Sequence, residues 1–200
     1  ETAADVSSAL NGASAVAIGC GMGTGQRQRG ILEEVLYLAK CPVIIDADGI
    51  NNLAMDISIV SDAKCPVVLT PHFGEMAKIC RTTVQEIQKA PLLCAQELAA
   101  QLKATIVLKG AHTIVASPDG RTFLNQTGNP GLAKAGSGDI LTGILSSLIS
   151  QGMSAFDAAV CAVYLHGAAA DRCVERMSEY FMQPDDILID LGRLLKEHIR

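Results

Sequence analysis

Four short runs of apolar residues constrain the fold more than any other feature of this sequence. They lie within residues 15–19, 42–46, 66–70 and 105–109. The runs are continuous rather than alternating, which is typical of strands that are covered on both faces of a parallel sheet. A parallel sheet needs a long connection between neighbouring strands, and that connection is usually a helix. The spacing of the runs leaves room for such helices.

The segments between and after these runs show the apolar spacing of helices. We expect helices at residues 24–40, 49–55, 73–80, 83–103, 137–150, 154–176 and 184–198. Pro91 should break or restart one of them, because proline cannot continue a helix interior. Two further runs, at residues 113–116 and 122–124, flank a Ser-Pro-Asp-Gly turn and predict an antiparallel hairpin at the far edge of the sheet. The sequence therefore predicts a single α/β domain over residues 1–200, with a doubly wound, mostly parallel sheet and helices on both faces.

Composition limits the partners that such a domain can have. Hydrophobic residues make up 49% of the chain and charged residues 18%, as in a globular protein. The net charge is −5 without a basic cluster, so we expect no nucleic-acid partner. The most apolar stretch, residues 140–149, is too short to span a bilayer, so we expect no membrane partner. Seven scattered cysteines without Cys-x-x-Cys spacing fit reduced thiols in the cytoplasm better than a zinc site.

A long glycine-containing loop, residues 128–139, leads directly into an apolar helix. Backbone N–H groups at a helix N-terminus lack partners within the helix and attract phosphate. We predict that Gly136, Ser137 and Gly138 hold a phosphoryl group there, since glycine lets the backbone approach a ligand closely. Asp139 beside such a site is the candidate catalytic carboxylate, which would accept a proton from an attacking hydroxyl. A simple helix cap is the alternative for this residue.

Four other motifs should meet at one edge of the sheet, because ligands in doubly wound folds bind beyond the carboxyl ends of the strands. The motifs are Gly-Cys-Gly-Met-Gly at residues 19–23, Asp-Ala-Asp at 46–48, Thr-Pro-His-Phe-Gly-Glu at 70–75 and Lys-Gly-Ala-His-Thr at 109–113. With the glycine loop, they resemble the ATP- or ADP-dependent NAD(P)H-hydrate dehydratases of the ribokinase-like superfamily. The resemblance covers most of residues 15–190. It implies that the chain opens partway through the pattern and forms the C-terminal part of a longer domain.

The resemblance also implies roles for particular residues. Gly21, His72 and Asp139 would bind the hydrated dinucleotide, although His72 could instead tie down its loop. The segment formed by Lys109, Gly110, Ala111, His112 and Thr113 would contact the nucleotide, together with Gly136, Ser137 and Gly138.

Other polar residues keep two interpretations. Glu75 could help to organise Mg²⁺ through water, or form a salt bridge on its helix. Asp46 and Asp48 could orient Mg²⁺, support the glycine loop of residues 128–139 or cap strand ends. We expect Lys134 to contact phosphate and His166 to be a packed or capping histidine.

The implied function is dehydration of (6S)-NAD(P)H hydrate, using ATP or ADP with Mg²⁺, through phosphorylation of the ring hydroxyl and elimination of phosphate. The expected partners are NADHX and NADPHX as substrates, further copies of the chain in a homo-oligomer, and an NAD(P)H-hydrate epimerase. Two alternatives stay open. One is a ribokinase-like kinase of a small alcohol or vitamin precursor, and the other is a non-catalytic nucleotide-binding subunit. The His72 turn favours the dehydratase, because kinases of this superfamily more often have Asn before the Glu.

Overall fold

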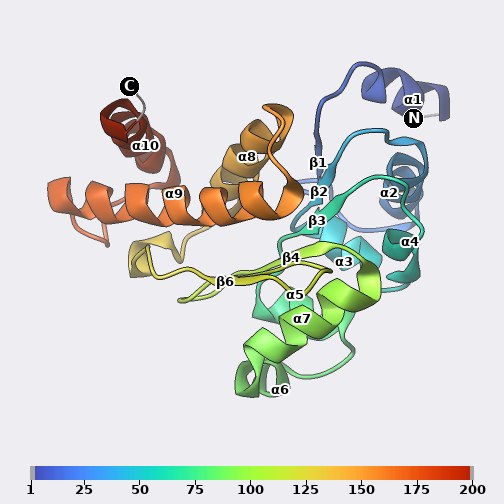
Figure 1. The fold of residues 1–200 in the computed structure, drawn as a ribbon, viewed down its shortest axis with the longest axis horizontal. Coiled ribbons are helices and arrows are strands. Elements are labelled where there is room, and N and C mark those ends of the chain that lie inside the picture. Colours follow the sequence, from blue (N-terminus) through green and yellow to red (C-terminus); the bar gives the residue numbers. More distant parts are fainter. Residues whose placement is uncertain (1–2, 199–200) are drawn as a thin grey trace.

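A parallel sheet with one antiparallel edge organises the computed structural model, which describes residues 3–198 (Figure 1). Within this part of the chain, the strands lie side by side in chain order: β1 (Val16–Ile18), β2 (Val43–Ile45), β3 (Val67–Leu69), β4 (Thr105–Leu108), β5 (Ile114–Ala116) and β6 (Thr122–Leu124). The first four are parallel, and β5 and β6 pair antiparallel. The predicted α/β fold with a hairpin at the far edge is therefore confirmed.

Helices connect the strands and follow the hairpin. They are α1 (Ala3–Leu10), α2 (Gln26–Leu38), α3 (Asp48–Leu53), α4 (Ser58–Ser61), α5 (Phe73–Ile79), α6 (Val84–Lys89), α7 (Pro91–Leu102), the short 3₁₀ helix η1 (Pro130–Leu132), α8 (Ser137–Ser150), α9 (Ala155–Arg176) and α10 (Pro184–His198). The predicted break is confirmed, since α6 ends at Lys89 and Pro91 begins α7. Three elements, α1, α4 and η1, were not among those predicted.

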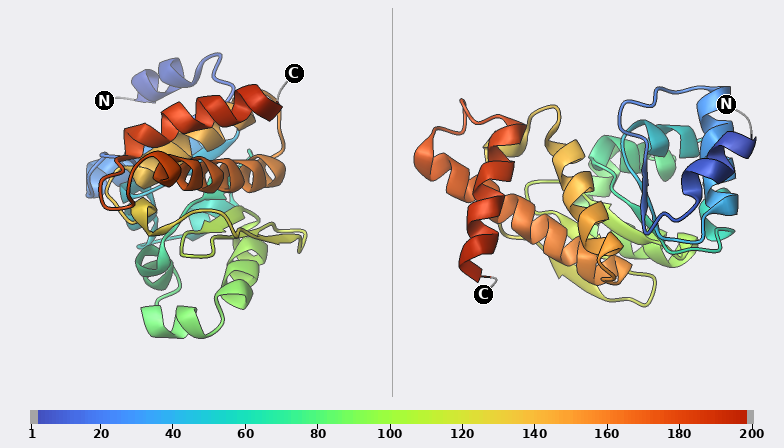
Figure 2. Two further views of the ribbon diagram at one scale, coloured as in Figure 1. Left: turned by 90° about the vertical axis from the view of Figure 1, so that its left-hand side faces the viewer. Right: turned by 90° about the horizontal axis from the view of Figure 1, so that it is seen from above.

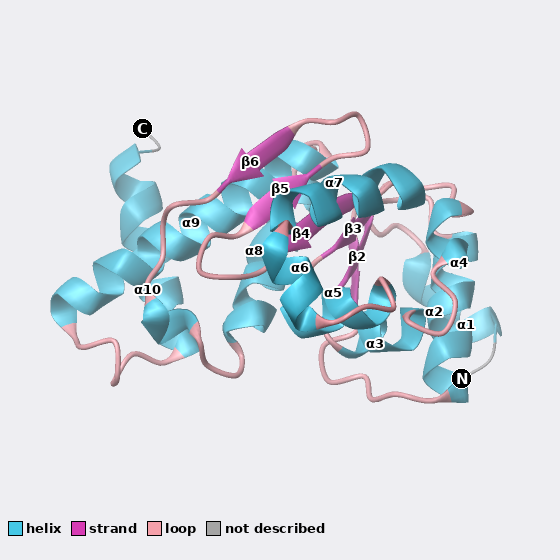
Figure 3. Ribbon diagram, turned by 90° about the horizontal axis from the view of Figure 1, so that it is seen from below, coloured by secondary structure: helices cyan, strands magenta, loops and turns pink. Residues whose placement is uncertain are grey.

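The two faces of the sheet have separate apolar cores. Alternate residues of β2 show the division, because Val43 and Ile45 belong to one core and Ile44 to the other. The first core packs against α2, α3, α5 and α7, and the second against α8 and α9. Figure 3 shows strands β2 to β6 side by side among these helices. The predicted cover of helices on both faces is confirmed.

The C-terminal helices extend the molecule away from α1 and α2 (Figures 1 and 2). α10 packs on α9, and a buried carboxylate joins them. Asp190 is 1% exposed and accepts hydrogen bonds from Arg176 of α9 and from Arg193 one turn along α10. Among residues 3–198, no helix is both long and apolar enough to cross a membrane.

Candidate active site at the start of helix α8

The first glycine turn contacts the residues that follow β2. Gly19 has φ +126°, and a Cβ atom there would lie 1.9 Å from the carbonyl oxygen of Asp46. Glycine is therefore required at this position. Four residues on, the N–H of Gly23 donates to the carboxylate of Asp48 at 2.9 Å. Asp48 therefore supports the first glycine turn, a role that was not predicted for it.

A buried ion pair joins the ends of two strands to helix α8. Asp46 is 1% exposed, and its Oδ1 lies 2.7 Å from the ammonium of Lys109. Its Oδ2 accepts a hydrogen bond of 2.8 Å from the hydroxyl of Thr142 on α8. Burial alone raises the pKa of Asp46, but the charge of Lys109 and the hydrogen bonds around the carboxylate outweigh it, so the pKa lies below its ordinary value. The Asp46 carboxylate therefore stays ionised and holds Lys109 beside α8.

The beginning of α8 leaves backbone N–H groups free. Its N-cap is Gly136, with φ +91° and no side-chain cap. The N–H of Ser137 donates to the carbonyl of Lys134, whereas those of Gly138 and Asp139 have no partner in the described part of the chain. Asp139 is exposed at the third helical position and is not the cap. An unfilled helix N-terminus of this kind is suited to bind an anion.

Gly138 brings this helix terminus next to the ion pair. A Cβ atom at position 138 would lie 3.4 Å from the Nζ of Lys109 and 3.6 Å from Oδ2 of Asp46. Glycine therefore leaves the space between the lysine ammonium and the helix backbone open. A phosphate in that space would meet one positive side chain and the free N–H groups together.

Cys20 and Asp139 complete this cluster. One ligand atom from each of Cys20, Asp46 and Asp139 lies within 4.8 Å of the other two. Burial raises the pKa of Cys20 to about 12, helped by its hydrogen bonds with Asp139 and Asp46. Cys20 is consequently a neutral thiol that can donate a hydrogen bond, and it is neither a nucleophile nor a thiolate ligand at neutral pH.

His72 and Glu75 form a reciprocal cap at the start of α5. The Nδ1 atom of His72 accepts from the N–H groups of Gly74 and Glu75, at 2.9 and 3.1 Å. The Glu75 carboxylate accepts from the N–H of His72 at 2.8 Å and is buried. Since Nδ1 is an acceptor, the other ring nitrogen carries the proton of the neutral imidazole. That nitrogen, Nε2, lies 3.6 Å from Oε1 of Glu75, and the His72 side chain as a whole remains 58% exposed.

The His72 turn also lies against the predicted nucleotide segment. His72 and Lys109 form a parallel bridge that continues the pairing of β3 and β4, with the N–H of Lys109 donating to the Pro71 carbonyl at 2.8 Å. A Cβ atom on Gly110 would lie 2.6 Å from the Phe73 ring. Phe73 therefore requires a glycine at position 110 and couples the two motifs.

The remaining predicted residues lie near the same edge of the sheet, beyond the carboxyl ends of the strands; we call this edge the rim. Ala111 and His112 are exposed, and Thr113 closes their turn by exchanging hydrogen bonds with the backbone of Gly110. Gly21 is exposed with φ +64°, and a Cβ atom there would meet open space.

Lys134 is used in a different way from the one predicted. Its Nζ donates to three backbone carbonyls, those of Glu179, Tyr180 and Met182, at 3.2, 3.0 and 2.5 Å. An ammonium has three donors, so none remains for a ligand. The prediction that Lys134 contacts phosphate is wrong, because this side chain fastens the glycine loop to the segment before α10.

Two residues of this rim were not predicted, namely Cys20 and Thr142. The position of Cys20 inside the first glycine motif was a usable signal. Thr142 follows Asp139 by three residues and hence lies on a neighbouring part of the helix surface. Nothing in the sequence links it to Asp46, which is 96 residues away in the chain.

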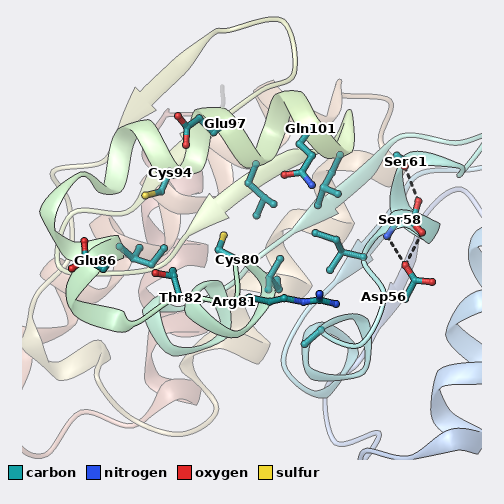
Figure 4. Close-up of a pocket in the computed structure, with 16 residues that line it drawn as sticks. Asp56, Ser58, Ser61, Cys80, Arg81, Thr82, Glu86, Cys94, Glu97 and Gln101 are labelled. Carbon is teal, nitrogen blue, oxygen red and sulfur yellow. Dashed lines mark hydrogen bonds between the residues drawn. The ribbon is translucent and has the colours of Figure 1, made fainter.

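A sizeable cavity in the described part of the chain lies away from this edge of the sheet. It has a volume of about 730 Å³ and is lined by residues at the far end of α5, including Ile79 and Arg81, and by residues of α6 and α7 (Figure 4). Three acidic side chains, Asp56, Glu86 and Glu97, line it as well (Figure 4). None of the glycine motifs contributes to this cavity, so we place the candidate active site at the start of α8.

The sequence profile that describes NAD(P)H-hydrate dehydratases matches residues 1–192. A bifunctional NAD(P)H-hydrate repair enzyme of Moorella thermoacetica is 41% identical over 181 residues, which are 90% of this chain and 34% of that protein. The crystal structure of an ADP/ATP-dependent NAD(P)H-hydrate dehydratase from Bacillus subtilis, co-crystallised with ATP and Mg²⁺, is 36% identical with a TM-score of 0.82. The match covers 92% of this chain and 64% of that one.

A ribokinase-like superfamily protein from Enterococcus faecalis is 28% identical, with a TM-score of 0.84, over 98% of this chain and 67% of that one. The chain thus spans about a third of the length of the Moorella relative and about two thirds of the Bacillus and Enterococcus structures. The ribokinase-like fold that the motifs implied is confirmed. The chain belongs to the NAD(P)H-hydrate dehydratase family.

Proposed function

We propose that this chain catalyses the nucleotide-dependent dehydration of (6S)-NAD(P)H hydrate to NAD(P)H, with ATP or ADP as the phosphoryl donor. One observation carries the proposal. The ammonium of Lys109, the free N–H groups of Gly138 and Asp139, and an exposed carboxylate all lie at the start of α8, in a member of this family. This arrangement combines a phosphate site with a group that can accept a proton.

The chemistry follows from the poor leaving ability of hydroxide. The ring hydroxyl of the hydrate would attack the terminal phosphorus of the nucleotide, and Asp139 would accept its proton. The ring nitrogen's lone pair would then expel the phosphate, and loss of a proton from the neighbouring carbon would restore the ring double bond. The products are NAD(P)H, inorganic phosphate and the nucleotide shortened by one phosphate.

The residues present fit a polyphosphate. Besides the free N–H groups, the hydroxyl of Ser137 is buried without a hydrogen-bond partner in residues 3–198, which suggests a group that a ligand satisfies. Lys109 would contact the phosphates, and residues 110–113 would contact the rest of the nucleotide. When bound, Mg²⁺ would supply charge neutralisation on the phosphates. Glu75 remains a proposed contributor through water, and its buried carboxylate already serves the cap of α5.

The dinucleotide would lie between the first glycine turn and the His72 turn. Gly21 leaves open space on its side of this edge, and the exposed side chain of His72, whose Nε2 lies 3.6 Å from Glu75, would turn this nitrogen to the substrate and donate a hydrogen bond to it. These two residues and Asp139 are the proposed substrate contacts.

We further propose that residues 1–200 belong to one ribokinase-like domain that acts in the cytoplasm as a homo-oligomer. We also propose association with an NAD(P)H-hydrate epimerase, which the bifunctional name of the Moorella relative supports. Size-exclusion chromatography with light scattering tests the first of these assemblies, and co-purification with an epimerase tests the second.

The activity is tested by supplying hydrated NADH or NADPH with Mg²⁺ and either ATP or ADP, and by following recovery of the NAD(P)H absorbance. We expect recovery with at least one nucleotide. Asp139→Asn should lower turnover by roughly a hundredfold or more, because it removes the proton acceptor from the third helical position but keeps its size. Stable phosphorylation of an alcohol without recovery of absorbance would favour the kinase. Thermal stabilisation by nucleotide without any turnover would favour a binding subunit.

A further inference from the structure

Two buried polar side-chain atoms near the start of α8 lack hydrogen-bond partners in the described residues. The hydroxyl of Ser137, whose residue is 5% exposed, and Nε2 of His166, whose residue is 8% exposed, have no partner in the described part of the chain. Leaving a buried polar group unsatisfied costs about 1–3 kcal/mol, so native proteins seldom do it without a reason. Two such groups beside one proposed ligand site suggest a common reason.

The imidazole of His166 lies beside the first residue of α8. It projects from α9, which packs on α8, and the Ser137 backbone and the Lys109 charge both influence its protonation. Burial lowers the pKa of His166 to about 4, a hydrogen bond with the Ser137 backbone opposes this change, and the nearby charge of Lys109 lowers the pKa further. At neutral pH His166 is therefore an uncharged group with one N–H donor and one acceptor.

His166 contacts the start of α8 and not an end of its own helix. It lies in the interior of the 22-residue helix α9, far from either end, so it does not cap the helix. The other buried residues of α9 are mostly apolar and include Ala162, Ala169 and Ala170, so an apolar side chain would be the usual occupant of such a position. Packing alone would be served better by such a side chain, since it would avoid the cost of an unpartnered nitrogen.

We propose that His166 and the Ser137 hydroxyl form the floor of the phosphate site, where a phosphate oxygen, or a water that it orders, satisfies both. The ligand is the polyphosphate of a nucleotide, so this inference rests on the proposed function. His166 acts together with Ser137 and fixes the loop that presents the N–H groups of Gly138 and Asp139. It is thus a positioning residue that the family motifs in this sequence did not reveal.

The test compares nucleotide affinity with stability. His166→Leu replaces the imidazole by an apolar group of similar size, and His166→Gln restores a side-chain N–H. Ser137→Ala removes the unpartnered hydroxyl. Tyr164→Phe, at a half-exposed position on α9, is the matched control. The dissociation constants of Mg-ATP and Mg-ADP are measured by calorimetry, and Tm is measured without ligand.

We expect His166→Leu to keep or raise Tm but to weaken nucleotide binding at least about tenfold, because a hydrogen bond to a charged group is lost. His166→Gln should recover most of the affinity, and Tyr164→Phe should change neither quantity. A lower Tm with unchanged affinity would overturn the inference.

A second comparison is a double-mutant cycle, which uses only variants whose Tm shows that they fold. Because both groups serve one phosphate, combining Ser137→Ala with His166→Leu should weaken binding by no more than the stronger single change. If the double variant loses affinity by the product of the two single losses, the two side chains do not share one phosphate contact, and the inference is contradicted. If the unaltered protein binds neither nucleotide, the proposed function fails as well. If it binds and all variants bind equally, only the floor is refuted.

Discussion

Replacing Lys109 by Met should destabilise the protein strongly, because it leaves Asp46 buried and ionised without its cation. Asp46 is 1% exposed, and only neutral donors such as the hydroxyl of Thr142 and the thiol of Cys20 would still donate to it. Removing one partner of a buried ion pair costs about 3–5 kcal/mol. Lys109 is 21% exposed, so water already screens part of this pair, and we take the lower end, about 3 kcal/mol. For a chain of this size, that is a fall in Tm of roughly 6–12 °C.

The assay is urea unfolding followed by circular dichroism at pH 7, with Asp46→Asn and the double variant completing a mutant cycle. Asp46→Asn should cost less, about 1–2 kcal/mol, because the partly exposed ammonium can turn to solvent and the amide oxygen can still accept from Thr142. The double variant should be more stable than additivity predicts by at least about 1 kcal/mol. Additive losses, or a Lys109→Met variant within about 0.5 kcal/mol of the unaltered protein, would refute the reasoning.

The pH dependence gives a second check on the same pair. The pKa of Asp46 is lower in the folded protein than its ordinary value of 3.8. Its contribution to stability is thus complete above pH 3.8 and is lost as the pH falls through the lower folded value. The stability difference between the unaltered protein and Lys109→Met should therefore be constant near neutral pH and shrink in acid.

Two further predictions concern side chains at and away from the site. Cys20 is an exposed residue, yet its raised pKa removes most of its thiolate. It should therefore react with iodoacetamide at pH 8 on the order of tens of times more slowly in the folded protein than in urea. Equal rates, measured by peptide mass spectrometry, would contradict the hydrogen bonds assigned to it. Arg81 and Lys103 each follow a helix with φ near +50°, a backbone conformation that favours glycine. Arg81→Gly, and the matched change Lys103→Gly, should each stabilise the protein by about 0.5–1 kcal/mol. A lower Tm in both variants would show that the two side chains make contacts worth more than this strain.

Local sequence patterns predicted the elements with strong signals of their own. The apolar runs located strands β1 to β4, and the Ser-Pro-Asp-Gly turn located the hairpin β5–β6. The glycine loop predicted a helix from Ser137 to Ser150, which is α8. These signals succeed because strand burial and turn geometry depend on residues that are close in sequence.

The contacts that were predicted wrongly or not at all join segments that are distant in the sequence. Lys134 resembles a phosphate contact by its place in the loop, yet its three donors are taken by carbonyls 45 to 48 residues further along. Thr142 contacts Asp46, and His166 lies behind Ser137, only because α8 and α9 pack on the sheet. No periodicity or motif records which polar side chain will lie opposite another after folding. Predictions from the sequence therefore located the rim but not its supporting contacts.

A crystal structure of the protein grown with ATP or ADP and Mg²⁺ is the most direct test of the site at α8. We expect the terminal phosphate to accept hydrogen bonds from the N–H groups of Gly138 and Asp139, with the ammonium of Lys109 on one side and the carboxylate of Asp139 facing the phosphorus. A nucleotide bound on another surface, such as the cavity beside Arg81, or an Asp139 side chain turned away from the phosphate, would contradict it.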